Sequence, residues 1–276
     1  MLYKSIISFL SFTFFYSLFI VLVPNKGIGT HQWQENQIRA QRYLYESTTD
    51  TVIVGTSLSA RLLLDSLKSL SSCAFSACVV EDGLRLILSK ELLPHYVLIE
   101  TNYILRSSNE ELVKVNTQGP LPFLRKYIPI IREQNSPISM FGSCFMQGAL
   151  APADTVDMER LQDNIRNRIL DDNTHFLTEY QLKKQMNVIR SLVSKLEDRG
   201  TKIVFYEMPL NDRLRHIRSN EQTRQAVIRM FPKDRYVYLP NDTSTYLTND
   251  GEHLDSEGQR RYSHYFKKTL ASIPLQ

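Results

Sequence analysis

The sequence predicts a three-layer α/β/α sandwich on a mostly parallel sheet, preceded by one N-terminal transmembrane helix. Short apolar strands alternate with helical segments, which is the pattern of a parallel sheet covered on both faces. The composition, 42% hydrophobic and 22% charged, is that of a globular chain. A separate apolar run without charges lies at the N-terminus, outside this alternation. These three observations define the fold class that we expect.

The apolar run covers residues 5–23 and lies between Lys4 and Lys26. As a helix it would rise ~28 Å, close to the thickness of the bilayer hydrocarbon. A cleaved signal peptide is the alternative, but no small-residue cleavage site follows and the run exceeds a usual signal core. A buried core helix is disfavoured because the run has no polar face. We therefore expect residues 1–24 to anchor the chain in a membrane, in an orientation that the flanking charges do not decide.

Residues 25–50 are polar with a weak helical pattern, and they predict a stalk before a domain at 51–276. The β-branched run Thr51–Val54 predicts a buried first strand that ends in Gly55. Acidic Glu81 and Asp82 favour the start of a helix. The elements expected in this half of the domain are a strand at 51–54, a helix at 58–70, a strand at 74–80, a helix from 81 to about 92 and a strand at 96–100.

Residues 103–154 contain five scattered prolines and predict an irregular insertion over one end of the sheet. Regular structure returns with an apolar stripe at 182–196, spaced as one face of a helix, and Gly200 is its expected stop. The remaining expected elements are a strand at 202–207, a helix at 219–231, a strand at 236–239 and a helix at 256–270.

The polar residues that follow the strands form the candidate site, because reactive groups gather at the carboxyl ends of parallel strands. Ser57 follows the first strand, Asn102 the third, and Asp250 and His253 the last. A serine nucleophile needs a base that a carboxylate orients, and the D-x-x-H spacing can supply both. Each residue also has a structural alternative, namely a helix cap for Ser57, a turn for Asn102 and a polar loop position for His253.

Three segments together resemble the SGNH (GDSL-like) hydrolase superfamily over about residues 51–271. They are VIVGTSLSARL, YVLIETN and DGEHLDSEGQRRYS. The resemblance implies a flavodoxin-like sheet, with Ser57 as nucleophile and His253 and Asp250 as its supporting pair. It also implies that the Asn102 side chain and the Ser57 N–H bind the oxyanion. No metal and no other cofactor is expected.

The sequence departs from the superfamily pattern in two blocks. The second block has no glycine before Gly83, so a backbone N–H near Cys78 or Val79 would have to supply that oxyanion donor. In the third block Glu100 and Tyr103 stand where the family often has glycine and aspartate. This divergence, with the anchor, is similar to membrane-tethered branches that modify bacterial surface polymers.

The resemblance therefore implies an extracytoplasmic, periplasmic serine esterase or O-acyltransferase in a single-pass membrane protein. Its expected partners are an acylated carbohydrate or envelope polymer, the bilayer through residues 5–23, and a membrane acyltransferase. A catalytically silent scaffold in a polymer export or acylation complex is the alternative. Nucleic acid is not expected, because the net charge of +4 is spread thinly and no Lys/Arg run exceeds two residues.

Overall fold

The computed structural model describes residues 2–22, 27–64, 70–108, 110–140, 156–174 and 177–273. The chain divides into two compact units. The first is Met1–Glu46 with Glu111–Ala151, and the second is Ser47–Glu110 with Pro152–Gln276. The second unit contains the sheet and every predicted site residue, so the candidate site lies within this unit.

The sheet of the second unit has five parallel strands in the order β2-β1-β3-β4-β5. Helices accompany it, so the predicted α/β class is confirmed. The order in which strands are added to the sheet reverses between β1 and β3, since β2 lies on one side of β1 and the later strands lie on the other. Ligands of such sheets bind outside the carboxyl ends of the strands at that point. The strands are β1 (Thr51–Gly55), β2 (Leu70–Ala74), β3 (Tyr96–Glu100), β4 (Lys202–Tyr206) and β5 (Val237–Tyr238).

The central strands form because their side chains are apolar on both faces of the sheet. Every residue of β1 and of β3 is buried. Successive side chains point to opposite faces, so Ile53 and Leu98 share one core with residues of the last helix. Burial of each such side chain contributes roughly 1.5–3 kcal/mol.

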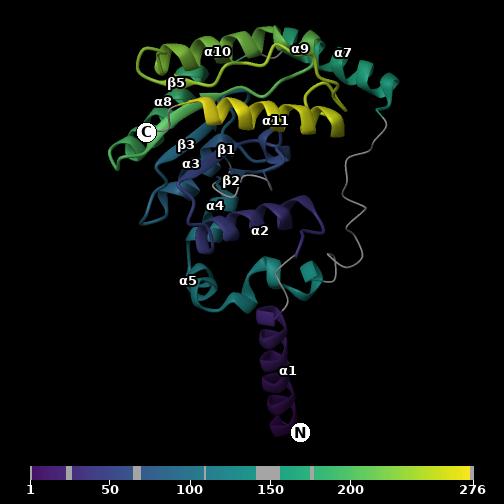
Figure 1. Cartoon of the computed structure of the whole chain (residues 1–276), viewed down its shortest axis with the longest axis vertical. Coiled ribbons are helices and arrows are strands. Elements are labelled where there is room, and N and C mark those ends of the chain that lie inside the picture. The colour runs from purple at the N-terminus through teal and green to yellow at the C-terminus, as the bar shows by residue number, and fades with distance from the viewer. Residues whose placement is uncertain are drawn as a thin grey trace. The chain divides into compact units, whose positions relative to one another are not determined.

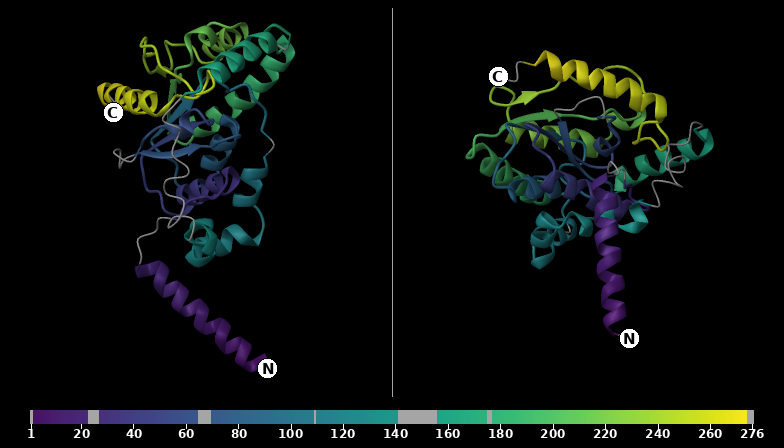
Figure 2. Two further views of the ribbon diagram at one scale, coloured as in Figure 1. Left: turned by 90° about the vertical axis from the view of Figure 1, so that its right-hand side faces the viewer. Right: turned by 60° about the horizontal axis from the view of Figure 1, so that its bottom comes forward.

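Helices cover both faces of this sheet (Figures 1 and 2). On one face Tyr262, Phe266 and Leu270 of α11 join the core that contains Ile53. On the other face α3 packs on β1 and β2, and α8 packs on β4 and α3. The helices of this unit are η1 (Ser59–Arg61), α3 (Val80–Leu88), α7 (Met158–Thr174), α8 (Glu179–Glu197), α9 (Asp212–Arg215), α10 (Arg218–Met230) and α11 (Ser256–Ser272).

The ends of the two long helices follow from their capping residues. Thr178 caps α8 in a capping box with Gln181. Gly200, at φ +87°, ends it because the N–H groups of Gly200 and Thr201 bond back to Glu197 and Leu196. The Asp255 carboxylate accepts from the Gly258 N–H at 2.7 Å and starts α11.

Three local predictions differ from the structure. Within the described part of the helix expected at 58–70, residues 58–64 form only the 3₁₀ turn η1, and residues 65–69 lie outside the described residues. Strand β2 begins at Leu70, four residues before the predicted strand. Leu62 is already extended, at ψ 131°, and packs in the core instead of continuing a helix. The start of β2 was missed because its first three residues are only half-buried, as on an edge strand, and carry serines. Helix α7 was not predicted.

The first unit contains a helix that is long and apolar enough to cross a membrane. This helix, α1 (Leu2–Leu22), has a mean hydropathy of 2.1 and no buried residue, and a signal sequence would have the same properties. The residues expected to form a stalk and an insertion supply the other helices of this unit. Those whose bounds lie within the described residues include α2 (Gln32–Tyr45), α4 (Glu111–Thr117), α5 (Pro120–Tyr127), η2 (Pro129–Ile131) and η3 (Glu133–Asn135).

Polar contacts hold the described part of the first unit together. Gln41 of α2 donates to Asn116 of α4 at 3.2 Å, and both side chains are buried. The Arg132 guanidinium lies 3.1 Å from the Glu46 carboxylate. Buried amides and charges of this kind require partners, so these pairs determine how α2 meets the 111–135 segment.

Candidate active site

Ser57 lies in the turn that leaves β1, directly after Gly55 and Thr56. The turn closes through a hydrogen bond from the Ala60 N–H to the Thr56 carbonyl at 2.9 Å. Gly55 is required there, because a Cβ would lie 2.5 Å from a carboxylate oxygen of Glu100. The hydroxyl of Ser57 is therefore presented at the carboxyl end of the sheet, only half-buried.

Asp250 and His253 lie in a short loop between β5 and α11. An antiparallel bridge pairs Thr248 with Leu254 and closes the base of this loop. Gly251 takes a φ of +95° at its tip, which a residue with a side chain adopts only under strain. The turn thus directs the Asp250 side chain toward His253, so residues of this one loop suffice to form the Asp250–His253 hydrogen bond.

The structure brings Ser57, His253 and Asp250 into one hydrogen-bonded chain. Ser57 Oγ lies 2.8 Å from His253 Nε2, and His253 Nδ1 lies 2.7 Å from Asp250 Oδ2. A carboxylate at Nδ1 favours the tautomer with its proton on Nδ1, which leaves Nε2 to accept from the serine. The three groups have the arrangement that activates a serine hydroxyl.

The charge of Asp250 is stabilised within its own loop. Oδ1 accepts the N–H groups of Glu252 and His253 at 3.0 and 2.7 Å. Burial raises the pKa of Asp250, but the hydrogen bonds from the His253 side chain and backbone outweigh burial and lower this pKa to about 2. Asp250 is therefore ionised over the whole neutral range and can hold an imidazolium.

Glu100 is a site residue whose role the sequence did not predict. It is fully buried beneath the Ser57 turn. Its Oε2 accepts the N–H groups of Thr56 and Ser59 at 2.9 and 3.2 Å, and its Oε1 accepts the Thr56 hydroxyl at 2.7 Å. Ser59 Oγ also donates to it, and lies 2.6 Å from the Tyr206 hydroxyl.

This network fastens the backbone on both sides of Ser57 to β3 and β4. The pKa of Glu100 lies above its usual value, because burial raises it by more than the hydrogen bonds from Ser59 and Thr56 lower it. A carboxyl group in this position is stable only because four donors face it.

Asn102 follows β3, as predicted, and its side chain contacts the backbone of Met208. Oδ1 accepts the Met208 N–H at 2.8 Å, and Nδ2 donates to the Met208 carbonyl at 2.9 Å. An amide nitrogen carries two hydrogens, so one of them is committed to this bond. The remaining hydrogen is the one that an oxyanion would use, and the oxyanion role of Asn102 stays a prediction.

The loop after β2 limits the choice of a further oxyanion donor. The Val79 N–H donates to the Asp82 carboxylate at 3.0 Å, where Asp82 belongs to the first turn of α3. The Val79 N–H is therefore used at the start of α3 and is not available to an oxyanion. The role of the Cys78 N–H stays a prediction.

Helix α7, which was not predicted, contacts the loop that carries Asp250 and His253. Arg168 Nε lies 2.9 Å from the Glu252 carboxylate. Tyr103 also hydrogen-bonds Glu252, and burial, followed by the charge of Glu252, raises the pKa of Tyr103. The apolar spacing of Leu161, Ile165 and Ile169 was the signal that would have identified α7 from the sequence.

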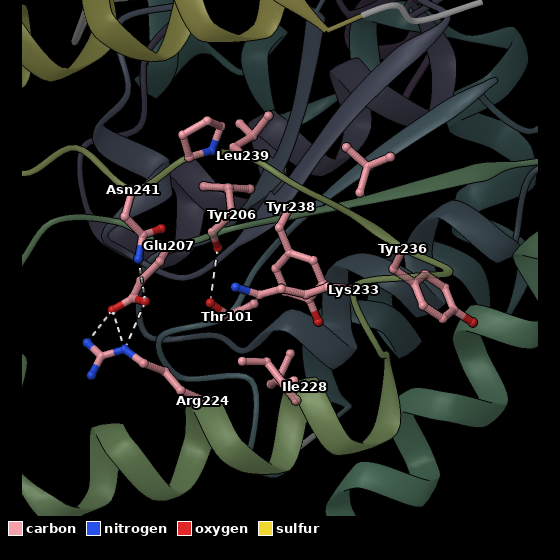
Figure 3. Close-up of a pocket in the computed structure, with 13 residues that line it drawn as sticks. Thr101, Tyr206, Glu207, Arg224, Ile228, Lys233, Tyr236, Tyr238, Leu239 and Asn241 are labelled. Carbon is pink, nitrogen blue, oxygen red and sulfur yellow. Dashed lines mark hydrogen bonds and ion pairs between the residues drawn. The ribbon is translucent and has the colours of Figure 1, made fainter.

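Two cavities of the second unit lie near the strand ends. One, of about 650 Å³, is lined by Asn102, Tyr103 and Arg106 together with residues of α7, α8 and α10. The other, of about 620 Å³, lies between β4, β5 and α10 (Figure 3). The Arg224–Glu207 ion pair borders this second cavity, as the close-up shows. Among the predicted site residues, only Asn102 lines either cavity, so the first adjoins the candidate site.

Two solved structures are distantly similar to this chain. No protein-family model matches the chain. No curated protein matches it either. A candidate acylhydrolase from Bacteroides fragilis is 11% identical, with a TM-score of 0.43 over 90% of this chain and 100% of its own. A GDSL-like lipase from Bacteroides thetaiotaomicron is 10% identical, with a TM-score of 0.43 over 87% of this chain and 100% of its own. Likenesses this distant carry no argument about activity.

Proposed function

We propose that the chain is a serine esterase or O-acyltransferase that works through an acyl-enzyme on Ser57. The observation that carries this proposal is the hydrogen-bonded chain from Ser57 Oγ through His253 to Asp250, at 2.8 and 2.7 Å. The second supporting feature is its place at the carboxyl ends of β1 and β3, where the strand order reverses.

In the first half-reaction Ser57 Oγ attacks the carbonyl carbon of an ester while His253 Nε2 takes the hydroxyl proton. Asp250 stabilises the imidazolium that forms. The negative oxygen of the tetrahedral intermediate would be bound by the Asn102 amide and the Ser57 N–H. When the ester C–O bond breaks, the leaving alcohol takes the proton from Nε2, and the acyl group remains on Ser57.

In the second half-reaction an acceptor hydroxyl gives its proton to Nε2 and attacks the acyl-enzyme. Water as acceptor gives hydrolysis, and a sugar hydroxyl gives transfer. Ser57 then recovers its proton from the imidazolium. Both outcomes use the same residues, so the acceptor that reaches Ser57 decides between them.

The proposed substrate is an acylated polysaccharide or another envelope polymer outside the cytoplasm. Helix α1 supports a place beside a membrane, because it has the length and hydropathy of an anchor. The side of the membrane follows from the resemblance that the sequence shows and is part of the proposal. With α1 in the bilayer, the sheet unit would act on polymers beside the membrane, with a membrane acyltransferase as a candidate acyl donor.

The test is covalent labelling of the full chain with a fluorophosphonate probe, followed by incubation with O-acetylated glycans. Wild-type protein should be labelled at Ser57 and should release acetate or acetylate an acceptor glycan. Ser57→Ala should abolish labelling, and His253→Ala should lower turnover by a factor on the order of 10⁵ to 10⁶, because the pair acts as a unit. A wild-type chain that neither reacts with the probe nor turns over these glycans is the scaffold of the alternative hypothesis.

A further inference from the structure

We propose that residues 121–131 of the first unit form a second membrane contact, which lies in the headgroup region of the bilayer beside α1. The inference rests on α1 as a membrane anchor, and it is independent of the chemistry at Ser57. We call these residues the interfacial segment. They comprise α5 without its first residue, Pro120, and the turn η2 that follows it.

The interfacial segment exposes large apolar side chains, although it lies in a folded unit. Phe123 and Tyr127 are 65% and 62% exposed, and their rings lie 5.1 Å apart between centroids. Four aliphatic side chains of the same segment are also exposed. These are Leu121, Leu124, Ile128 and Ile131. Scattered apolar residues are ordinary on a protein surface, but six large ones exposed within eleven residues are the kind of cluster that marks an interaction site.

The charges around the patch select a membrane as its occupant. From Gly119 to Arg132 the sequence GPLPFLRKYIPIIR has no acidic residue and has three basic ones. Arg125 and Arg132 are buried and paired with Glu133 and Glu46, and Lys126 is exposed beside the Tyr127 ring. Aromatic and aliphatic side chains flanked by a basic one suit the boundary between acyl chains and anionic headgroups.

The contacts of α1 place the patch at the corresponding depth. Helix α1 contacts η2, and the Tyr16 hydroxyl donates to the Asn135 carbonyl at 2.7 Å. Tyr16 lies six residues before the end of α1 at Leu22, which corresponds to roughly 9 Å along the helix. Apolar faces of interfacial helices enter the bilayer by ~5–10 Å. The segment thus lies beside the last turns of α1, at the depth where such faces insert.

Tryptophan quenching in vesicles tests the proposal on the full chain. The protein is reconstituted into brominated phosphatidylcholine with added phosphatidylglycerol, and its fluorescence is compared with that in unbrominated vesicles. Phe123→Trp reports on the patch, Phe12→Trp on α1, and Leu92→Trp, 84% exposed in the second unit, is the matched control. Wild-type protein supplies the baseline, because all variants share its one tryptophan, Trp33.

Bromine should quench Phe123→Trp and Phe12→Trp beyond this baseline and leave Leu92→Trp unchanged. Quenching of Phe12→Trp without quenching of Phe123→Trp overturns the second contact and leaves the anchor intact. If Phe12→Trp is not quenched, the anchor is rejected, and the second contact beside it is rejected with it. Ile128→Trp repeats the measurement if Phe123→Trp does not fold.

Discussion

The two oxygens of the Asp250 carboxylate bind the side chain and the backbone of His253 at once, with 2.7 Å to Nδ1 and 2.7 Å to the amide nitrogen. The same side chain therefore orients the imidazole and shapes the loop that carries it. Replacing Asp250 should affect both activity and loop stability.

Asp250→Asn should lower turnover by a factor of ~10³ to 10⁴, because an amide can favour the wrong imidazole tautomer. Burst kinetics with an activated ester measures this loss. Labelling at the wild-type rate would contradict the orienting role of the carboxylate.

The difference in unfolding free energy between the wild type and Asp250→Asn should also depend on pH in a defined window. The pKa of Asp250 falls to about 2 in the folded chain, below its ordinary value of 3.8. A lowered pKa stabilises the fold above pH 3.8, and this contribution is lost as pH falls through about 2. Urea unfolding at a series of pH values should show the unfolding free energies of the wild type and the variant converging as pH falls from 3.8 to about 2. A constant difference in unfolding free energy down to about pH 2 would refute this stabilising role of the Asp250 charge.

Asn102→Ala should reduce turnover by ~10²- to 10³-fold if the amide binds the oxyanion. It should also cost about 1–3 kcal/mol of stability, because the buried N–H and carbonyl of Met208 lose their partners. The control is Thr101→Val, which removes the neighbouring hydrogen bond to the Tyr206 carbonyl. Thr101→Val should lose stability alone, and equal kcat values for the two variants would remove Asn102 from the chemistry.

Glu100→Gln should slow turnover by ~10- to 10²-fold with KM little changed, because the turn that holds Ser57 loses its four-donor acceptor. Asp172→Asn is the matched control. Asp172 is also buried and accepts the N–H groups of Arg218 and Ser219, away from the turn. Equal kcat losses in both variants would mean that Glu100 has no particular relation to Ser57.

The raised pKa of Glu100 makes the stability of the fold depend on pH in the direction opposite to that of Asp250. Burial raises this pKa, so the folded chain keeps the proton to a higher pH than the unfolded chain. The stabilisation is complete below the ordinary glutamate value and is lost as pH rises through the raised pKa. Wild type should therefore lose stability relative to Glu100→Gln as pH rises from 4 upward, which urea unfolding can follow.

Gly251→Ala should destabilise the chain by about 1–3 kcal/mol through its positive φ. It should also reduce turnover, because the new Cβ would lie 2.9 Å from side-chain atoms of Ile165 and Leu214 and displace His253. Gly200→Ala has the same kind of strain, at φ +87°, but its Cβ would meet no atom within 4 Å. Thermal unfolding and ester turnover of both variants separate strain from displacement, and unchanged turnover in Gly251→Ala would contradict the argument.

The amino-acid sequence alone determined the features that depend on local chemistry. The apolar run at the N-terminus, the buried strands β1 and β3 and the caps of α8 and α11 follow from side-chain type and spacing. The Asp250–His253 pair belongs to this class, because a closed loop of seven residues from Thr248 to Leu254 holds both partners.

Only the tertiary structure decided the features in which distant segments compete for the same atoms. The helix expected from residue 58 is wrong over residues 58–64, because Leu58 and Leu62 pack in the core with α11, and Glu100 holds the Thr56–Ser59 turn. No local pattern distinguishes the buried Glu100 from a solvated acid, since its four donors lie more than forty residues away along the chain. Ser57 meets His253, 196 residues later, because parallel strands bring their carboxyl ends to one edge of the sheet.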